Sequence, residues 1–210
     1  MSTLIDPKTQ NFLGKPKFWS IATENQQYFN QLHVERELES QIVKFKELTG
    51  NYPKFIDSHN HAHVATENIT KAFCKISQKY NIERTRLPIQ IRFPESFHNN
   101  NFHHLVSDCS IQVKKLIENS FLVVPKFLGM HLMGKDLNLS RLRKTLSSMN
   151  DCSGKLELMV HPGYKTERKG GCTNSGDDFD EFSKSEEREI EMEQLVEINK
   201  CFSCIKPLIK

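Results

Sequence analysis

Hydrophobic positions along the chain recur with two different periods, and each period predicts one type of element. Apolar residues spaced three and four apart predict helices over residues 24–49, 67–80, 102–119, 140–149 and 183–200. Short apolar runs between these helices predict strands over residues 54–57, 83–87, 127–131 and 155–161. Strands that alternate with helices are typical of βα units, so we expect an α/β fold with a parallel sheet.

The length of the chain fits one domain better than a complete barrel. The sequence has 210 residues and no long linker rich in Pro, Gly or Ser, so we expect a single domain over residues 1–210. A typical (β/α)8 barrel has ~250 residues and eight strands. This sequence predicts only about five strands, since a terminal apolar stretch at residues 205–209 follows the four above, and it opens with a helix. Two alternatives follow: an open sheet, or a barrel without its first elements.

Composition and charge argue against several classes of protein. Hydrophobic residues make up 37% and charged residues 26%, which is not typical of a disordered chain. The net charge of +3 comes from scattered lysines without an Arg-rich stripe, so we expect no nucleic-acid partner. No apolar run approaches the ~20 residues of a membrane span, and residues 1–10 lack the pattern of a secretory signal. We therefore expect a cytoplasmic protein without a membrane partner, whose six cysteines are reduced thiols.

A histidine-rich segment, Asp57-Ser58-His59-Asn60-His61-Ala62-His63, follows the first predicted strand. If the strand continued, Asp57 and the three histidines would share one face, with neighbours ~6.6 Å apart. Two imidazoles at this spacing can converge on one divalent ion, whereas a third would stand too far away unless the strand ends there. Asp57 could instead orient a ligating imidazole through its second nitrogen. Solvated histidines at a polar strand end are the alternative, but the pattern favours a metal or catalytic role.

Two further polar residues stand at the ends of other predicted strands. His161 ends the strand over residues 155–161, on the same face as Glu157, and Pro162-Gly163 follows it. Such a position suits either a catalytic or a structural histidine, since β/α active sites gather at the C-terminal ends of strands. Arg86 ends the strand over residues 83–87 and is expected either to bind an anionic or carbonyl oxygen or to form a salt bridge.

Several segments match one family in order and spacing from about residue 11 to residue 200. They are FLGK (12–15), ELESQI (37–42), FIDSHNHAHV (55–64), TRLP (85–88), ELMVHPGY (157–164), GGC (170–172) and DDF…S…RE (177–189). With these pieces the chain resembles the YdjC-like carbohydrate deacetylases, the group that includes chitooligosaccharide deacetylase. The GGC segment resembles the animal-type branch.

The resemblance implies a fold, an activity and a set of roles. It implies a distorted (β/α) barrel and a hydrolase that removes acetyl groups from N-acetylated carbohydrates with a divalent metal, Mg2+ first and Zn2+ as the alternative. An amide carbonyl needs a Lewis acid and an activated water, and the departing amine needs a proton donor. His59 matches a metal ligand, and His161 matches a histidine that helps proton transfer. The supporting or substrate-binding residues that we expect are Asp57, His61, His63 and Arg86. The expected partners are an acetylated oligosaccharide and, as a further possibility, a second copy of the chain.

The sequence also departs from the family pattern. Family members begin with an Ala-Asp-Asp-Phe-Gly-like motif that supplies the catalytic aspartate, followed by a Gly-Met-His-like segment with another metal histidine. Neither motif stands before Phe12. We therefore expect this chain to lack the first strands and helices of the family domain. Weak metal binding, low turnover and an aggregation-prone edge strand would follow. The alternative function is a catalytically inactive deacetylase-like protein that binds a glycan or a protein partner.

Overall fold

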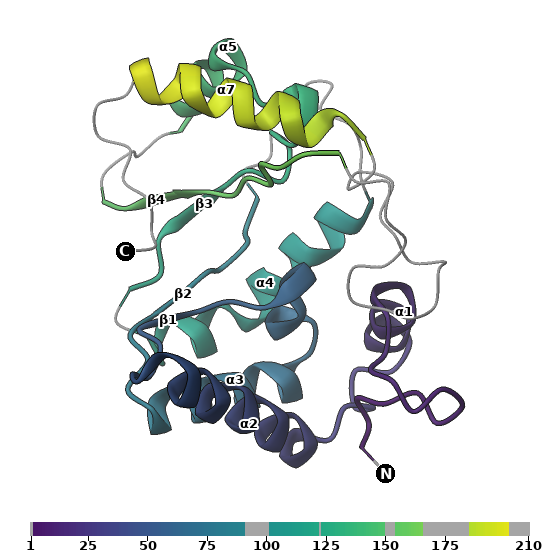
Figure 1. The fold of residues 1–210 in the computed structure, drawn as a ribbon. Coiled ribbons are helices and arrows are strands. Elements are labelled where there is room, and N and C mark those ends of the chain that lie inside the picture. The colour runs from purple at the N-terminus through teal and green to yellow at the C-terminus, as the bar shows by residue number, and fades with distance from the viewer. Residues whose placement is uncertain (1, 91–100, 122, 150–153, 166–184, 202–210) are drawn as a thin grey trace. The chain divides into compact units, whose positions relative to one another are not determined.

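The computed structural model describes residues 2–90, 101–121, 123–149, 154–165 and 185–201 (Figure 1). These residues form two compact units: the first contains the described residues up to Phe127, and the second contains those from Leu128 onward. The prediction of one domain over residues 1–210 stays a prediction. In chain order the elements are α1 (Lys15–Glu24), α2 (Gln31–Thr49), β1 (Phe55–Ile56), η1 (His59–Val64), α3 (Glu67–Lys79), β2 (Arg84–Thr85), α4 (Asn101–Glu118), β3 (Lys126–Leu128), η2 (Gly134–Asp136), α5 (Leu139–Ser147), β4 (Leu156–Leu158) and α7 (Glu187–Cys201).

The first unit is built on a parallel βαβ arrangement, which confirms the predicted α/β class. Strand β1 leads through η1 and α3 to β2, and the two strands pair in parallel with Phe55 opposite Arg84. Val123, which follows α4, adds a parallel bridge to Arg84. The predicted strands are confirmed in place, but they are only two residues long here.

Helices α2 and α3 pack against each other and lie side by side in Figure 1. The apolar face of α3 is buried and includes Phe73 and Ile76, as its spacing predicted. Between the helices, Lys75 Nζ lies 2.7 Å from a Glu35 carboxylate oxygen, and Lys79 Nζ lies 2.5 Å from Glu39. Both pairs repeat at four-residue intervals, so one row of ion pairs follows the helix interface.

The N-terminal part of the chain differs from the prediction. The helix expected from residue 24 begins at Gln31, because the Asn30 side chain accepts hydrogen bonds from the N–H groups of Leu32 and His33. A helix that the pattern did not predict, α1, precedes it and buries Trp19 and Ala22.

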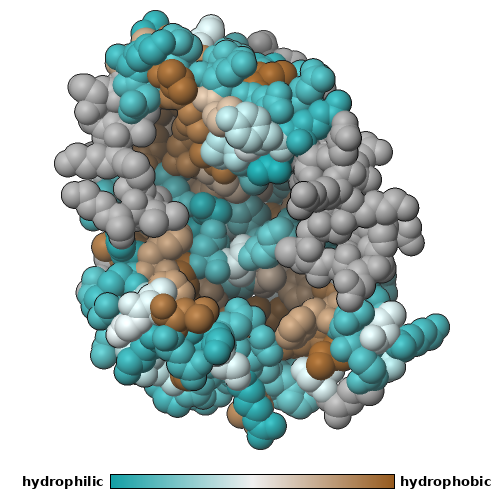
Figure 2. Space-filling model, in the orientation of Figure 1, coloured by the Kyte–Doolittle hydropathy of each residue, from teal (hydrophilic) through white to brown (hydrophobic). Residues whose placement is uncertain are grey.

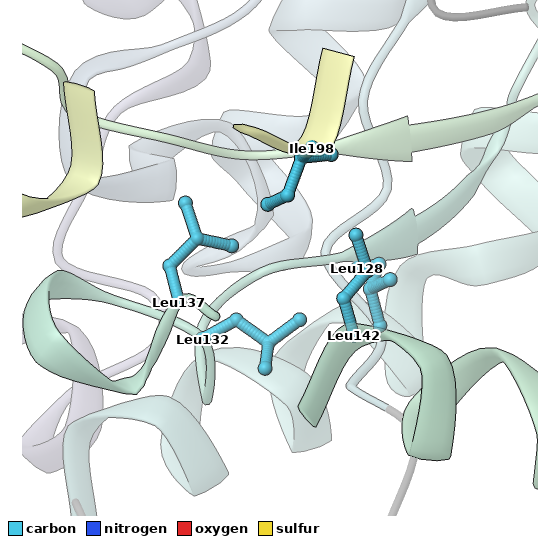
Figure 3. Close-up of a cluster of buried hydrophobic side chains, with 5 residues drawn as sticks. All are labelled: Leu128, Leu132, Leu137, Leu142 and Ile198. Carbon is cyan, nitrogen blue, oxygen red and sulfur yellow. The ribbon is translucent and has the colours of Figure 1, made fainter. Parts of the chain in front are cut away.

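The second unit contains Leu128, which is the last residue of β3, together with β4, α5 and α7. Gly129 has φ +140°, and an added Cβ would stand 2.5 Å from the Met159 carbonyl oxygen, so the close approach of the two segments requires glycine. The Met159 N–H donates to the Leu128 carbonyl at 2.8 Å beside this contact. Five buried aliphatic side chains from β3, the following segment, α5 and α7 form the core cluster of Figure 3: Leu128, Leu132, Leu137, Leu142 and Ile198.

The face of the molecule drawn in Figure 2 carries both hydrophilic and apolar residues. Figure 2 shows apolar patches interrupted by hydrophilic side chains on the face that it draws. Across the described ranges, no helix is both long and apolar enough to cross a membrane. Cys74, Cys109 and Cys201 are free thiols, as expected for the described cysteines.

Candidate functional site

The histidine-rich segment after β1 is a helical turn and not a continued strand. Strand β1 ends at Ile56, and residues 59–64 form the 3-10 turn η1, in which Asn60 and His61 have left-handed φ values of 50° and 58°. The prediction that Asp57 and the three histidines share one strand face is therefore wrong. Ser58 explains the change of direction: its carbonyl accepts from the His61 N–H at 3.1 Å, and its hydroxyl accepts from the His63 N–H at 2.8 Å. These local hydrogen bonds take the place of the ladder that a continued strand would form.

His63 is a buried side chain with protein partners on both ring nitrogens. Its Nε2 lies 2.9 Å from the Arg86 carbonyl oxygen, and its Nδ1 lies 2.7 Å from Ser58 Oγ. Because a carbonyl oxygen only accepts, Nε2 carries the proton, and in the neutral ring Nδ1 accepts from the Ser58 hydroxyl. Burial lowers the pKa of His63 and outweighs the Asp57 carboxylate and the Arg86 carbonyl, which raise it. His63 therefore fixes the turn as a neutral imidazole.

Asp57 and Arg86 form the charged side of this cluster. Arg86 Nη1 lies 2.6 Å from Asp57 Oδ2, so the salt-bridge alternative predicted for Arg86 is the one that the structure contains. Asp57 Oδ1 also accepts from the Ser58 N–H at 2.7 Å and lies 3.8 Å from His63 Nδ1. The guanidinium of Arg86 lies over the Phe127 ring, 5.6 Å from its centroid. The two charges thereby connect the ends of β1 and β2 beside the histidine turn.

The other two histidines of the turn differ in exposure. His61 is buried, and its ring lies edge-on to Phe127 with centroids 5.9 Å apart. His59 is exposed. Within the part of the chain that the structure describes, no three His, Cys, Asp or Glu side chains form a group that could hold a metal ion. The described residues thus do not by themselves fit the divalent metal that the sequence implies. Both nitrogens of His63 already have protein partners, Ser58 and the Arg86 carbonyl.

His161 belongs to the second unit and lies three residues beyond the end of β4. The ladder ends at Leu158, so the predicted strand position and the shared face with Glu157 do not extend to His161: Glu157 is buried, whereas 38% of the His161 side chain is exposed. The His161 N–H donates to Glu191 Oε2, and Arg188 Nε donates to the His161 carbonyl at 3.2 Å. Its backbone is therefore held by α7 while its imidazole reaches the surface.

Glu191 is a residue that the sequence did not single out. Its side chain is fully buried, and its Oε1 accepts from the Gly134 N–H at 2.6 Å. Burial raises the pKa of Glu191, although the two backbone N–H groups that it accepts from lower it. Nothing in the acidic pattern of residues 186–197 distinguishes this glutamate from its neighbours, because only the tertiary structure buries it. Ser58 was visible within the DSH motif, but its hydroxyl could not be assigned to His63 from spacing.

Two of the segments that carry the family resemblance, GGC (170–172) and DDF (177–179), lie outside the described residues. The others lie within the described residues on both units.

Comparison with known proteins gives consistent matches. The sequence model of one family, described as YdjC-like protein, matches residues 1–198. A carbohydrate deacetylase of Danio rerio is 31% identical over 220 residues, which cover 92% of this chain and 68% of the relative. Carbohydrate deacetylases of Xenopus laevis and Homo sapiens are 28% and 29% identical, covering 81% and 92% of this chain and 60% and 61% of those proteins. The chain thus spans about two thirds of the length of the relatives that it matches. No solved structure gives a significant match.

Proposed function

Because the chain belongs to the YdjC-like protein family, we propose that it is a carbohydrate deacetylase that hydrolyses the amide of N-acetylated sugars. The observation that carries this proposal is the similarity, over 92% of the chain, to a relative named carbohydrate deacetylase. The proposed substrate is an acetylated oligosaccharide. The distorted (β/α) barrel that the family resemblance implies is likewise a proposal for this chain, and the parallel pairing of β1 with β2 supports it.

In this proposal His161 supplies the proton to the departing amine. Hydrolysis of an amide requires a donor that reaches the leaving nitrogen, and an imidazole is the side chain best suited to this near neutral pH. The partly exposed side chain and fixed backbone of His161 support the assignment, because a donor must be reachable and well positioned.

The histidine turn has a supporting role in the same proposal. Asp57, Arg86 and His63 hold the turn, which presents His59 at the surface. His59 remains our proposed ligand for a divalent metal, Mg2+ before Zn2+, although the described residues supply no three-ligand group. When bound, such a metal would act as a Lewis acid toward the amide carbonyl.

Acetate release from N-acetylglucosamine oligomers tests the function. The purified chain, supplied with Mg2+ or Zn2+, is expected to release acetate, and His161→Ala and His59→Ala are each expected to abolish the release. His104→Ala, which removes an exposed histidine on α4, serves as the matched control and should leave the rate unchanged. A folded, metal-supplied chain that releases no acetate would contradict the proposed activity.

A second candidate function has one observation in its favour. The lack of a three-ligand metal group in the described ranges favours a catalytically inactive deacetylase-like protein that binds a glycan or a protein partner. In that case calorimetric titration would detect binding of N-acetylglucosamine oligomers, and no acetate would appear. Binding accompanied by turnover would contradict this second function.

A further inference from the structure

The first turns of α7 hold the His161 segment from both sides. Glu191 accepts the N–H of His161, and Arg188, three residues earlier on the same helix face, donates to its carbonyl. The Gly163 N–H in turn donates to the Arg188 carbonyl at 3.3 Å. A Cβ at Gly163 would overlap the Arg188 guanidinium, so the Pro162-Gly163 sequence allows this close approach. One helix therefore fixes the peptide groups on both sides of His161.

Two backbone N–H groups compensate for the cost of burying the Glu191 carboxylate. A carboxylate removed from water costs several kcal/mol unless hydrogen bonds replace its hydration. Each Glu191 oxygen accepts one backbone N–H, from Gly134 and from His161, and such bonds to an ionised acceptor are about twice as strong as neutral ones. Within α7, which is described in full, Glu191 is the only buried carboxylate. Its burial is thus a specific feature of the position that faces His161.

The same carboxylate lies close to the imidazole. Glu191 Oε1 is 3.9 Å from His161 Nδ1, which is the ring nitrogen nearer to the backbone. Two other charges act on Glu191: the negative charge of Glu187 and the positive charge of Arg188. We propose that Glu191 is a positioning residue for His161: its buried carboxylate fixes the His161 backbone and, beside the buried Nδ1, sets the orientation and protonation of a partly exposed imidazole.

Magnetic resonance of the full chain tests this role without requiring turnover. In Glu191→Gln the side chain keeps its volume, but its amide group brings a donor to a place where only acceptors fit, so one backbone N–H loses its partner. We expect the His161 or Gly134 amide to exchange at least about tenfold faster, the factor that corresponds to the loss of one charge-assisted hydrogen bond. We also expect the His161 imidazole to titrate at lower pH, because the imidazolium loses a nearby negative charge.

Glu193→Gln is the matched control, since it removes the same charge from an exposed position of the same helix. If Glu191→Gln and Glu193→Gln give the same His161 titration and the same rates of amide exchange, the proposal is overturned. Should Glu191→Gln fail to fold, the native chain still decides: rapid, unprotected exchange of the His161 and Gly134 amides would also overturn it. Arg188→Gln supplies an independent variant, which is expected to loosen His161 while leaving Glu191 in place.

The inference rests on the proposed function only in treating His161 as the proton donor. Loss of acetate release in every form of the chain would contradict the function while leaving the titration result intact. Unchanged titration in Glu191→Gln would contradict the positioning role while leaving acetate release as measured. Where acetate release is measurable, the pH profile of kcat/KM is expected to shift in Glu191→Gln in the same direction as the His161 titration.

Discussion

His63 in the first unit and His161 in the second use protein contacts in opposite ways. The His63 ring is buried, and both of its nitrogens bond to groups of the same unit. In His161 the backbone is held on both sides, whereas the imidazole is more than one third exposed. The first arrangement uses the imidazole to hold a backbone, and the second uses a helix to hold the backbone beneath an imidazole. Position in a histidine motif is therefore a weaker guide to chemistry than the partners of each nitrogen.

The buried titratable groups of the two units differ in the same sense. Burial holds His63 in its neutral, basic form, and burial favours the protonated form of Glu191. Folding therefore weakens the binding of a proton by His63 and strengthens the binding of a proton by Glu191. The two units should therefore respond to pH in opposite directions.

The largest expected effect is on the first unit. His63→Ala removes both ring hydrogen bonds and leaves a cavity beside Phe73, whose ring centroid is 4.9 Å from that of His63. We expect a loss of about 3 kcal/mol in the free energy of unfolding. Trp19 is the single tryptophan and is buried in the first unit, so its fluorescence during urea unfolding measures this loss.

His59→Ala is the comparison for that experiment, because His59 is exposed in the same turn and should cost no more than about 0.5 kcal/mol. Equal losses in the two variants would show that His63 does not hold the turn.

A smaller effect, of about 1.4 kcal/mol for each unit of pKa difference, is expected from pH. The pKa of His63 lies below its unfolded value of about 6.5, so its contribution to stability is present above that pH and is lost as pH falls toward the folded pKa. The pKa of Glu191 lies above its unfolded value of about 4.3, so its contribution is present below that pH and is lost as pH rises through the folded pKa.

Trp19 fluorescence measures the first trend, and amide exchange of α5 and α7 measures the second. Glu191→Gln removes the titrating group, so it should reduce the pH dependence of stability in the second unit and leave that of the first unit unchanged. The comparison fails if both units lose stability in the same direction between about pH 4.5 and 6.5.

The smallest effect concerns the strained turn. Asn60 has a left-handed φ of 50°, which glycine adopts without a side-chain penalty. Asn60→Gly is expected to stabilise the first unit by up to about 0.5 kcal/mol, as measured by Trp19 fluorescence, and to lower acetate release by loosening the turn that presents His59. Asn81→Gly is the control, since Asn81 has φ 52° outside the turn and should change stability alone. Reduced acetate release in both variants would remove the link between the turn and activity.

The sequence predicted the helices of the core better than the path of the chain between them. Helix α3 matches its predicted bounds within one residue, because its apolar spacing and its Thr66 N-cap are local signals. The pattern did not predict helix α1. The start predicted for α2, at residue 24, was too early because the cap at Asn30 was not recognised. The histidine segment was predicted as a strand from its alternation, whereas Ser58 turns it into η1. The Ser183 start predicted for the last helix lies outside the described residues.

The sequence by itself determined the family, the alternation of strands and helices, and the histidines and arginine of the candidate site, because these depend on residue identity and spacing. The tertiary structure alone decided which of them are buried and paired. Ser58 and Arg86 occupy the nitrogens of His63, and Glu191 lies 30 residues from His161 in the chain. Such partners are brought together by the burial of α3 and α7 against their units. Burial depends on contacts that are distant in sequence, and no local pattern records them.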